Sequence, residues 1–136
     1  MAYSIEAAIK SGLFDEVMVS TDDAEIAETA KECGASVPFL RSAKTANDFA
    51  ILKDVLVEVL AKYRELGRTF DKVCCLLPTA PLIDVSDIRD AYEILVENNS
   101  TSVIPVVKYS YTIFRSLKIE DGILTMNWPE NYSKRS

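Results

Sequence analysis

A run of five apolar residues, Val73 to Leu77, constrains the fold of this 136-residue chain more than any other feature. It ends at the turn sequence Pro78-Thr79-Ala80-Pro81. A continuous apolar run bounded by turn residues is typical of a strand buried on both faces. Pro78 ends such a strand because proline has no N–H to give to a sheet. Ligands bind beyond the carboxyl ends of strands in open α/β sheets, so residues 78–81 are predicted to form a ligand loop.

The pattern around this run alternates between helices and strands. Helical spacing of apolar residues predicts helices within 2–12, 21–34, 49–67 and 86–98. Shorter apolar runs predict strands at 15–21, 72–77 and 101–107, with 36–40 as an edge strand or loop because of Pro38. Residues 113–119 and 123–128 alternate around Glu120-Asp121-Gly122, which predicts a β-hairpin. This order predicts one α/β domain over residues 1–136, with a mostly parallel sheet covered by helices on both faces.

Composition narrows the chemistry that the chain can carry. It has no histidine, which excludes a Ser-His-Asp triad, a Cys-His pair and a His-ligated metal, and leaves carboxylates, Lys, Arg, hydroxyls and an oxygen-bound metal. A net charge of −6 without a basic stripe disfavours nucleic-acid binding. Three cysteines without a CxxC motif suggest neither a disulfide framework nor a zinc site. No membrane-length apolar stretch or signal-peptide pattern is present, so the expected location is the cytoplasm.

Glycine usage bears on nucleotide binding. Nucleotide-binding α/β folds usually carry a glycine-rich phosphate loop between their first strand and first helix. The four glycines, Gly12, Gly34, Gly67 and Gly122, are far apart, and each matches a helix end or a turn. The alternation also starts on a helix. The sequence therefore predicts that the first strand and the phosphate loop are missing.

Local motifs leave alternatives open. Ser20-Thr21-Asp22-Asp23 follows a predicted strand, and its two carboxylates could hold Mg²⁺. A helix cap also explains this motif, and it is the favoured interpretation. The loop 41–48 could bind a phosphate or a base edge, or it could be a solvated connection. Tyr109 and Tyr111, with neighbouring cations, would line a pocket or lie on a half-exposed strand.

The chain resembles the acylneuraminate cytidylyltransferase family, most closely its pseudaminic acid cytidylyltransferases. The matching segments, in the family's order and spacing, are AYSIEAAIKSGLFDEVMVSTDDAEIAETAKECGASVPFLR, CCLLPTAPLI, SVIPVVKYSYTIFRSLKI and NWPENYSKRS. The resemblance implies a Rossmann-like fold with a hairpin-bearing dimerisation region at 108–128, and a homodimer. It also implies transfer of CMP from CTP to a nine-carbon nonulosonic acid, with Mg²⁺ and release of pyrophosphate.

The resemblance assigns two groups of site residues and leaves catalytic residues and metal ligands unassigned. Residues at the strand ends and in two loops match the nucleotide pocket: Ser20, Thr21, Asp22, Arg41, Lys44, Asp48, Pro78, Thr79, Ala80 and Pro81. Residues nearer the carboxyl end match the part that handles the sugar acid and its carboxylate: Lys108, Tyr109, Tyr111, Arg115, Asn131, Lys134 and Arg135.

The chain also departs from the family pattern. The family opens with a strand and a Gly-Gly-Ser-Lys loop that grips the triphosphate, and it continues beyond Lys134-Arg135-Ser136 into a segment with metal-binding acids. The expectation is a chain truncated at both ends, inactive alone, with its Mg²⁺ ligands elsewhere and with two strand edges left unpaired. The alternative is a non-catalytic α/β binding or partner domain with a degenerate nucleotide site.

Overall fold

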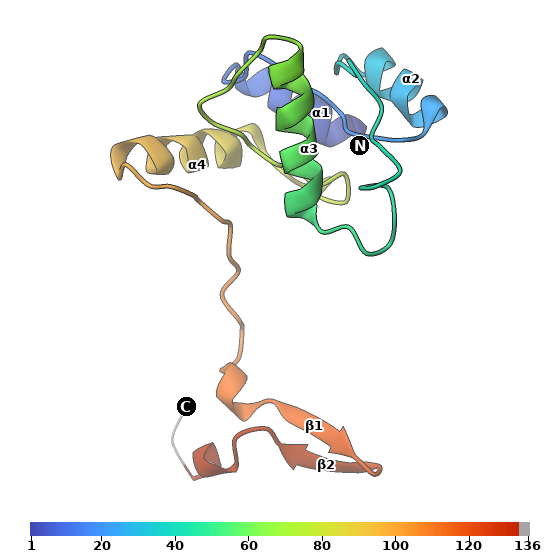
Figure 1. The fold of residues 1–136 in the computed structure, drawn as a ribbon. Helices are drawn as coiled ribbons and strands as arrows, with labels where there is room; N and C mark the ends of the chain where they lie inside the picture. Colours follow the sequence, from blue (N-terminus) through green and yellow to red (C-terminus); the bar gives the residue numbers. More distant parts are fainter. Residues whose placement is uncertain (134–136) are drawn as a thin grey trace. The chain divides into compact units, whose positions relative to one another are not determined.

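Four α-helices account for most of the regular structure in residues 1–133, the part of the chain that the computed structural model describes. They are α1 (Ala2–Ser11), α2 (Ala24–Glu32), α3 (Leu52–Glu65) and α4 (Val85–Glu97), and they confirm the predicted helices (Figure 1). The chain divides into two compact units, residues 1–103 and 104–136. All four helices belong to the first unit, and the 108–128 region belongs to the second.

Carboxylate side chains explain where two of the helices, α2 and α4, begin. The carboxylate of Asp23 accepts hydrogen bonds from the backbone N–H groups of Glu25 (2.8 Å) and Ile26 (3.0 Å), so it caps α2. Asp84 caps α4 in the same way through Ser86 N–H, at 2.9 Å. Each carboxylate satisfies a donor that the first helical turn leaves free. The structure confirms the cap interpretation of the motif at 20–25.

The predicted parallel sheet is not formed by the described residues. Its only trace there is one parallel bridge, in which Ser36 O accepts from Val19 N (3.0 Å) and Ser36 N donates to Val17 O (2.8 Å). Residues 72–76 make no backbone hydrogen bond within residues 1–133. Residues 101–107 are not a strand either, and in 36–40 only Ser36 takes part in the bridge, which fits the loop alternative for that segment. A strand is defined by pairing with a neighbour, and residues 72–76 and 101–107 have no paired neighbour in the described part of the chain.

The apolar run that was expected to be buried on both faces is therefore partly open. Val73 and Leu77 are about half exposed, at 52% and 51%, and Cys74 and Cys75 are also exposed. The predicted buried strand is an extended segment in this structure. Its side chains line a cleft, described below.

The core of the first unit lies between α1, α2 and the bridged segments. Ile5, Ala30 and Ala35 are its buried members, and Val17 and Val19 pack against them. The chain leaves α2 through Gly34, which has φ +93°, a conformation that L side chains rarely adopt. A Cβ atom there would lie 3.1 Å from Ile9 Cδ1, so glycine also allows α1 to pack closely.

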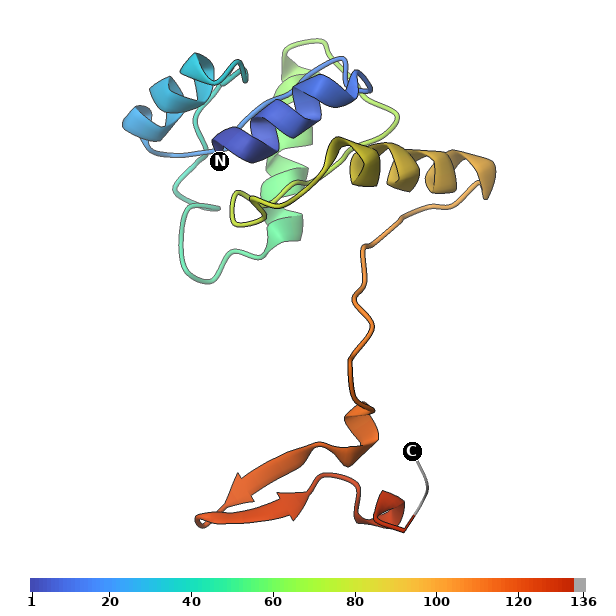
Figure 2. The ribbon, with the colours of Figure 1, turned by 180° about the vertical axis from the view of Figure 1, so that it is seen from behind.

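Two further contacts hold α3 and α4 in the first unit. Tyr63 of α3 is 2% exposed, and its ring meets those of Phe39 and Phe70 edge to face at 5.2 and 5.1 Å. Helices α1 and α4 lie side by side (Figure 2). There Arg89 donates from Nε and Nη2 to Ser11 O, each at 3.1 Å, which satisfies a carbonyl at the end of α1.

The second unit contains the predicted β-hairpin. Strands β1 (Leu117–Glu120) and β2 (Ile123–Met126) pair antiparallel, with Leu117 opposite Met126 and Ile119 opposite Leu124. The turn residues Asp121 (φ 53°) and Gly122 (φ 78°) both have positive φ, as the tight turns favoured in hairpins require. Short 3-10 helices flank the hairpin at η1 (Ile113–Arg115) and η2 (Pro129–Asn131).

Helix length also bears on membrane insertion. No helix within residues 1–133 is both long enough and apolar enough to cross a lipid bilayer.

Candidate functional site

A cleft of about 930 Å³ opens in the first unit. Its apolar lining comes from α1, from α3 and from the two extended segments at 17–19 and 73–77. The lining side chains include Ile5 and Ala8 from α1, and Val55, Leu56 and Val59 from α3. The cleft thus lies beside residues 72–76, which pair with no strand in the described part of the chain. Concave, mostly apolar surfaces with a few polar groups are the usual form of ligand sites.

The cleft brings together six of the ten residues predicted to bind the nucleotide. These come from three separate segments and are Ser20, Thr21, Asp22, Arg41, Asp48 and Pro78. The other four do not line the cleft in the described part of the chain: Lys44, Thr79, Ala80 and Pro81. The assignment of both groups to the nucleotide stays a prediction.

Arg41 is anchored to the end of the segment at 17–21. Its Nε donates to Ser20 Oγ at 3.2 Å and its Nη2 donates to the backbone oxygen of Ser20. Its backbone N–H donates to Thr21 O at 2.8 Å. These bonds use one side of the guanidinium and leave the N–H donors of Nη1 available to a ligand. Three predicted residues are therefore in direct contact.

The apolar run is anchored to α1 where it meets Pro78. Ser4 Oγ donates to Leu77 O at 3.3 Å, and the amino group of Met1 donates to Pro78 O at 3.4 Å. These are contacts over 73 and 77 residues of sequence. They hold the predicted ligand loop at the start of α1.

Glu58 of α3 holds the loop that follows Arg41. Its carboxylate accepts from Ser42 N–H and Ser42 Oγ, both at 2.8 Å, and from Thr45 Oγ1. Lys62, one helical turn further on, pairs with it at 2.8 Å and also donates to Leu40 O at 2.6 Å. Hydrogen bonds from Lys62, then Thr45 and Ser42, lower the pKa of Glu58 from 4.5 to about 2.

Sequence reasoning missed Glu58 and Lys62. A Glu–Lys pair four residues apart is common on solvated helix faces, so its presence in the sequence is not distinctive. The signal that could have found Glu58 is its position on the helix, since it lies one turn from Val55 and close to Val59 and Tyr63, on the apolar side of α3.

A second polar network crosses the wall of the cleft. Glu16 accepts from Ser36 Oγ, from the Tyr63 hydroxyl at 3.0 Å and from Arg68 Nη1 at 2.6 Å. Burial raises the pKa of Glu16, but the three hydrogen bonds outweigh it and the pKa is lowered. Burial, followed by the Glu16 carboxylate, raises the pKa of Tyr63 to about 12. At neutral pH the lowered pKa keeps Glu16 ionised and the raised pKa keeps Tyr63 neutral, which suits a structural network.

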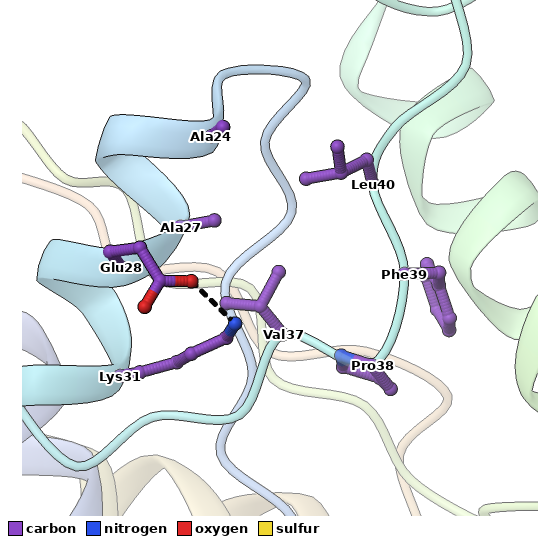
Figure 3. Close-up of a pocket in the computed structure, with 8 residues that line it drawn as sticks. All are labelled: Ala24, Ala27, Glu28, Lys31, Val37, Pro38, Phe39 and Leu40. Atoms are coloured by element: carbon purple, nitrogen blue, oxygen red, sulfur yellow. Dashed lines mark hydrogen bonds and ion pairs between the residues drawn. The ribbon is translucent and has the colours of Figure 1, made fainter.

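A smaller hollow of about 280 Å³ lies between α2 and residues 37–40 (Figure 3). Its side chains are mainly apolar, and its charged residues, Glu28 and Lys31, pair with one another at 2.7 Å. None of the predicted site residues lines it.

The described residues among those predicted for the sugar acid lie in the second unit and line neither of these two hollows. Tyr109 and Tyr111 are 71% and 88% exposed. Lys108 and Arg115 are exposed, and Asn131 is half-buried. Lys134 and Arg135 lie outside the described residues.

The arrangement of acidic side chains bears on metal binding. Within residues 1–133, no group of three or more Asp, Glu, Cys or His side chains is placed to hold a metal ion. The Asp23 carboxylate near the cleft is engaged in capping α2. Mg²⁺ is usually held by one or two carboxylates together with substrate phosphates, so Mg²⁺ binding stays an expectation from the resemblance.

The fold and the cleft define an α/β protein with a mostly apolar cleft. Polar side chains from residues 20–22 and 41–48 line part of this cleft. A family profile described as cytidylyltransferase matches residues 1–131, and the chain belongs to that family. This confirms the family recognised from the sequence.

Three relatives illustrate the similarity. A pseudaminic acid cytidylyltransferase from Campylobacter jejuni subsp. jejuni serotype O:2 is 35% identical over 137 residues, covering 100% of this chain and 59% of that protein. A CMP-N,N'-diacetyllegionaminic acid synthase from Legionella pneumophila is 37% identical over 108 residues, covering 78% and 47%. An N-acylneuraminate cytidylyltransferase A from Danio rerio is 31% identical over 122 residues, covering 90% and 27%. The chain spans about three-fifths, 59%, of the first of these relatives.

Proposed function

We propose that this chain belongs to an enzyme that transfers CMP from CTP to a nine-carbon nonulosonic acid and releases pyrophosphate. Family membership supports the nucleotidyl transfer, and the printed names of the relatives support the class of acceptor. The observation that carries the proposal is the cleft, which joins Arg41 and Asp48 to the strand-end residues Ser20 and Thr21.

The chemistry of these side chains suits a cytidine. Cytosine presents an amino group and a ring carbonyl, and ribose presents hydroxyls. The free N–H donors of Arg41 match a carbonyl or a phosphate oxygen, and the Asp48 carboxylate matches an amino group or a ribose hydroxyl. We assign Pro78 and its loop to the wall that closes over the nucleotide.

The reaction itself is an in-line displacement. The anomeric hydroxyl oxygen of the sugar acid forms a bond to the α-phosphorus and gives up its proton to water. The bond from that phosphorus to the bridging oxygen breaks, and pyrophosphate leaves with the electron pair. We assign the binding of the sugar acid to the second unit, where Lys108 and Arg115 offer cations to a carboxylate. The resemblance implies Mg²⁺ as the cofactor, and we place its ligands outside residues 1–133, where no group of three or more acidic, Cys or His side chains is gathered.

Titration of the 136-residue chain with CTP tests the nucleotide assignment. UTP is the matched control, because it differs from CTP by a carbonyl in place of the base amino group. We expect saturable binding of CTP that is tighter than that of UTP, and we expect Asp48→Asn to reduce this preference. No saturable binding, or equal binding of CTP and UTP, contradicts the assignment.

A pyrophosphate assay tests catalysis. With CTP, pseudaminic acid and Mg²⁺, we expect the 136-residue chain alone to release none. The reason is that the glycines of the described residues lie at helix ends or turns and form no phosphate loop. Measurable turnover contradicts this expectation. A non-catalytic binding domain remains the alternative, but no observation favours it over the family activity.

We further propose that the hairpin is a dimerisation element and that the extended segments at 17–19 and 72–77 occupy strand positions of a Rossmann-like sheet. Antiparallel pairing puts Leu117, Ile119, Leu124 and Met126 on one face of the hairpin. Ile119 and Leu124 are 73% and 63% exposed. An isolated two-stranded hairpin is marginally stable, so an apolar partner for this face would stabilise it. The cytoplasmic location stays a prediction.

Light scattering tests the dimer. We expect the wild-type chain to be dimeric and Ile119→Lys to be monomeric. Thr125→Lys is the control, because Thr125 lies on the opposite, polar face of the same hairpin. A monomeric wild type, or a dimer that survives Ile119→Lys, contradicts the proposal.

A further inference from the structure

We propose that Glu58 is a positioning residue for the nucleotide loop: it holds residues 41–48 against α3 and so sets the position of Arg41 and Asp48 at the cleft. The inference rests on the proposed cytidine site. It adds a residue that belongs to none of the segments assigned to that site.

The geometry shows how much of this carboxylate is used. A carboxylate can accept about four hydrogen bonds, and Glu58 accepts from Ser42 N–H, Ser42 Oγ, Thr45 Oγ1 and Lys62 Nζ. Three of these donors belong to the loop. The side chain of Glu58 is 15% exposed and that of Lys62 is 26% exposed, so solvent screens the group less than it screens a surface pair.

The loop has few other anchors. Arg41 is tied to Ser20 and Thr21 at one end. At the other end, Asn47 forms local turns, accepting from Phe49 N–H at 2.9 Å and from Ala50 N–H at 3.1 Å. Local turns fix the shape of a loop without fixing its place in the molecule. In the described chain, the link from the middle of the loop to a helix is made through Glu58.

The burial of Thr45 supports this role. Thr45 is 6% exposed although it lies in a polar loop, and its hydroxyl donates to Glu58. Thr45 also lines the cleft beside Asp48. Lys62 reinforces the arrangement because it binds Glu58 and the Leu40 carbonyl together. The segment 40–45 is therefore held to α3 at three successive places.

Glu58→Ala tests the proposal, with Glu65→Gln as the matched control. Glu65 lies on the same helix, is exposed, and loses the same charge on substitution. Glu58→Gln serves as a milder variant if the alanine variant does not fold, since an amide oxygen keeps one acceptor. Melting temperatures of all variants show which of them are folded at the temperature of the assays.

Two measurements are needed. We expect Glu58→Ala to speed amide hydrogen exchange at Ser42 and Thr45 by about tenfold, while α3 stays protected. We expect it to weaken CTP binding by about tenfold and to reduce the preference for CTP over UTP, which a purely structural role would leave unchanged. Glu65→Gln should change neither quantity.

The outcomes separate the two proposals. Unchanged exchange at residues 41–48 in Glu58→Ala, or faster exchange with unchanged CTP binding and preference, overturns the positioning role. A wild-type chain that does not bind CTP, combined with faster loop exchange in Glu58→Ala, overturns the proposed function and leaves Glu58 as an anchor of the loop alone.

Discussion

The hydroxyl of Tyr63 donates a hydrogen bond to Glu16 Oε1 at 3.0 Å, between residues 47 positions apart in the sequence. The bond joins α3 to the extended segment that carries the predicted strand-end residues. Arg68 binds the other oxygen of Glu16 at 2.6 Å. This link between helix and segment forms one wall of the cleft.

Replacing Tyr63 by phenylalanine tests the strength of that link. We expect Tyr63→Phe to lower the free energy of unfolding by about 1 kcal/mol, because Glu16 loses one donor while the ring keeps its contacts with Phe39 and Phe70. Tyr63→Ala should cost about 3–5 kcal/mol, because it also empties a buried ring site. Urea denaturation measures both. A Tyr63→Phe variant as stable as the wild type would contradict the role of the hydroxyl.

Arg41→Lys tests whether the guanidinium geometry matters at the cleft. A lysine cannot bind Ser20 Oγ and Ser20 O with a planar fork and still present further donors. We expect CTP affinity to fall by about tenfold, equivalent to about 1.4 kcal/mol. Arg64→Lys, on the exposed side of α3, is the control and should have no effect. Titration with CTP measures the change, and unaltered affinity in Arg41→Lys contradicts the assignment.

Stability should fall in acid because of Glu58 and Glu16. Their pKa values are lowered in the folded state, that of Glu58 from 4.5 to about 2. A lowered folded pKa means that the stabilising contribution is complete above the ordinary value and is lost as pH falls toward the folded value. We therefore expect the urea midpoint to drop between about pH 5 and about pH 2.

Variants assign this pH effect to the carboxylate. The drop should be smaller in Glu58→Gln, which cannot be protonated, than in the wild type. Glu65→Gln, the control on the same helix, should follow the wild-type curve. Identical pH profiles for Glu58→Gln and the wild type would refute the contribution of Glu58.

Asp23→Ala tests the helix cap against the metal interpretation of the acidic motif. We expect it to lower the free energy of unfolding by about 1 kcal/mol, because two N–H groups of α2 lose their acceptor, and Asp23→Ser to recover most of the loss. Asp22→Ala should have little effect, because Asp22 is not the cap. Thermal denaturation with and without Mg²⁺ measures all three. A Mg²⁺-dependent rise in melting temperature that Asp22→Ala or Asp23→Ala removes would favour a metal site instead.

The helices and the hairpin could be predicted because their determinants are local. Asp23 and Asp84 cap residues two and three positions away, and a helix forms its backbone bonds within its own segment. Asp121 and Gly122 are residue types that tolerate the positive φ angles of this turn. The family pattern assigned Ser20, Thr21 and Arg41 to one pocket, and the structure adds that Arg41 is hydrogen-bonded to Ser20 and Thr21.

The apolar run at 73–77 shows why the sheet could not be predicted in the same way. Its residue types are suited to a strand, but a strand obtains its hydrogen bonds from neighbours that may lie far away in sequence. Residues 72–76 have no such neighbour within the described chain. Glu58 is a similar case, because its spacing to Lys62 is typical of a solvated ion pair. Its role as a loop anchor depends on hydrogen bonds from Ser42 and Thr45, which the spacing does not predict.

The sequence by itself therefore determined the helices, their caps, the hairpin turn and the family, because each depends on residues close together or on a pattern along the chain. Only the tertiary structure decided that the apolar run lines a cleft, that Tyr63 meets Glu16, and that the Glu58 carboxylate holds the loop carrying Arg41. Those features depend on which distant segments come into contact. Hydrogen bonds and burial between such segments are set by the packed arrangement and not by local residue preference.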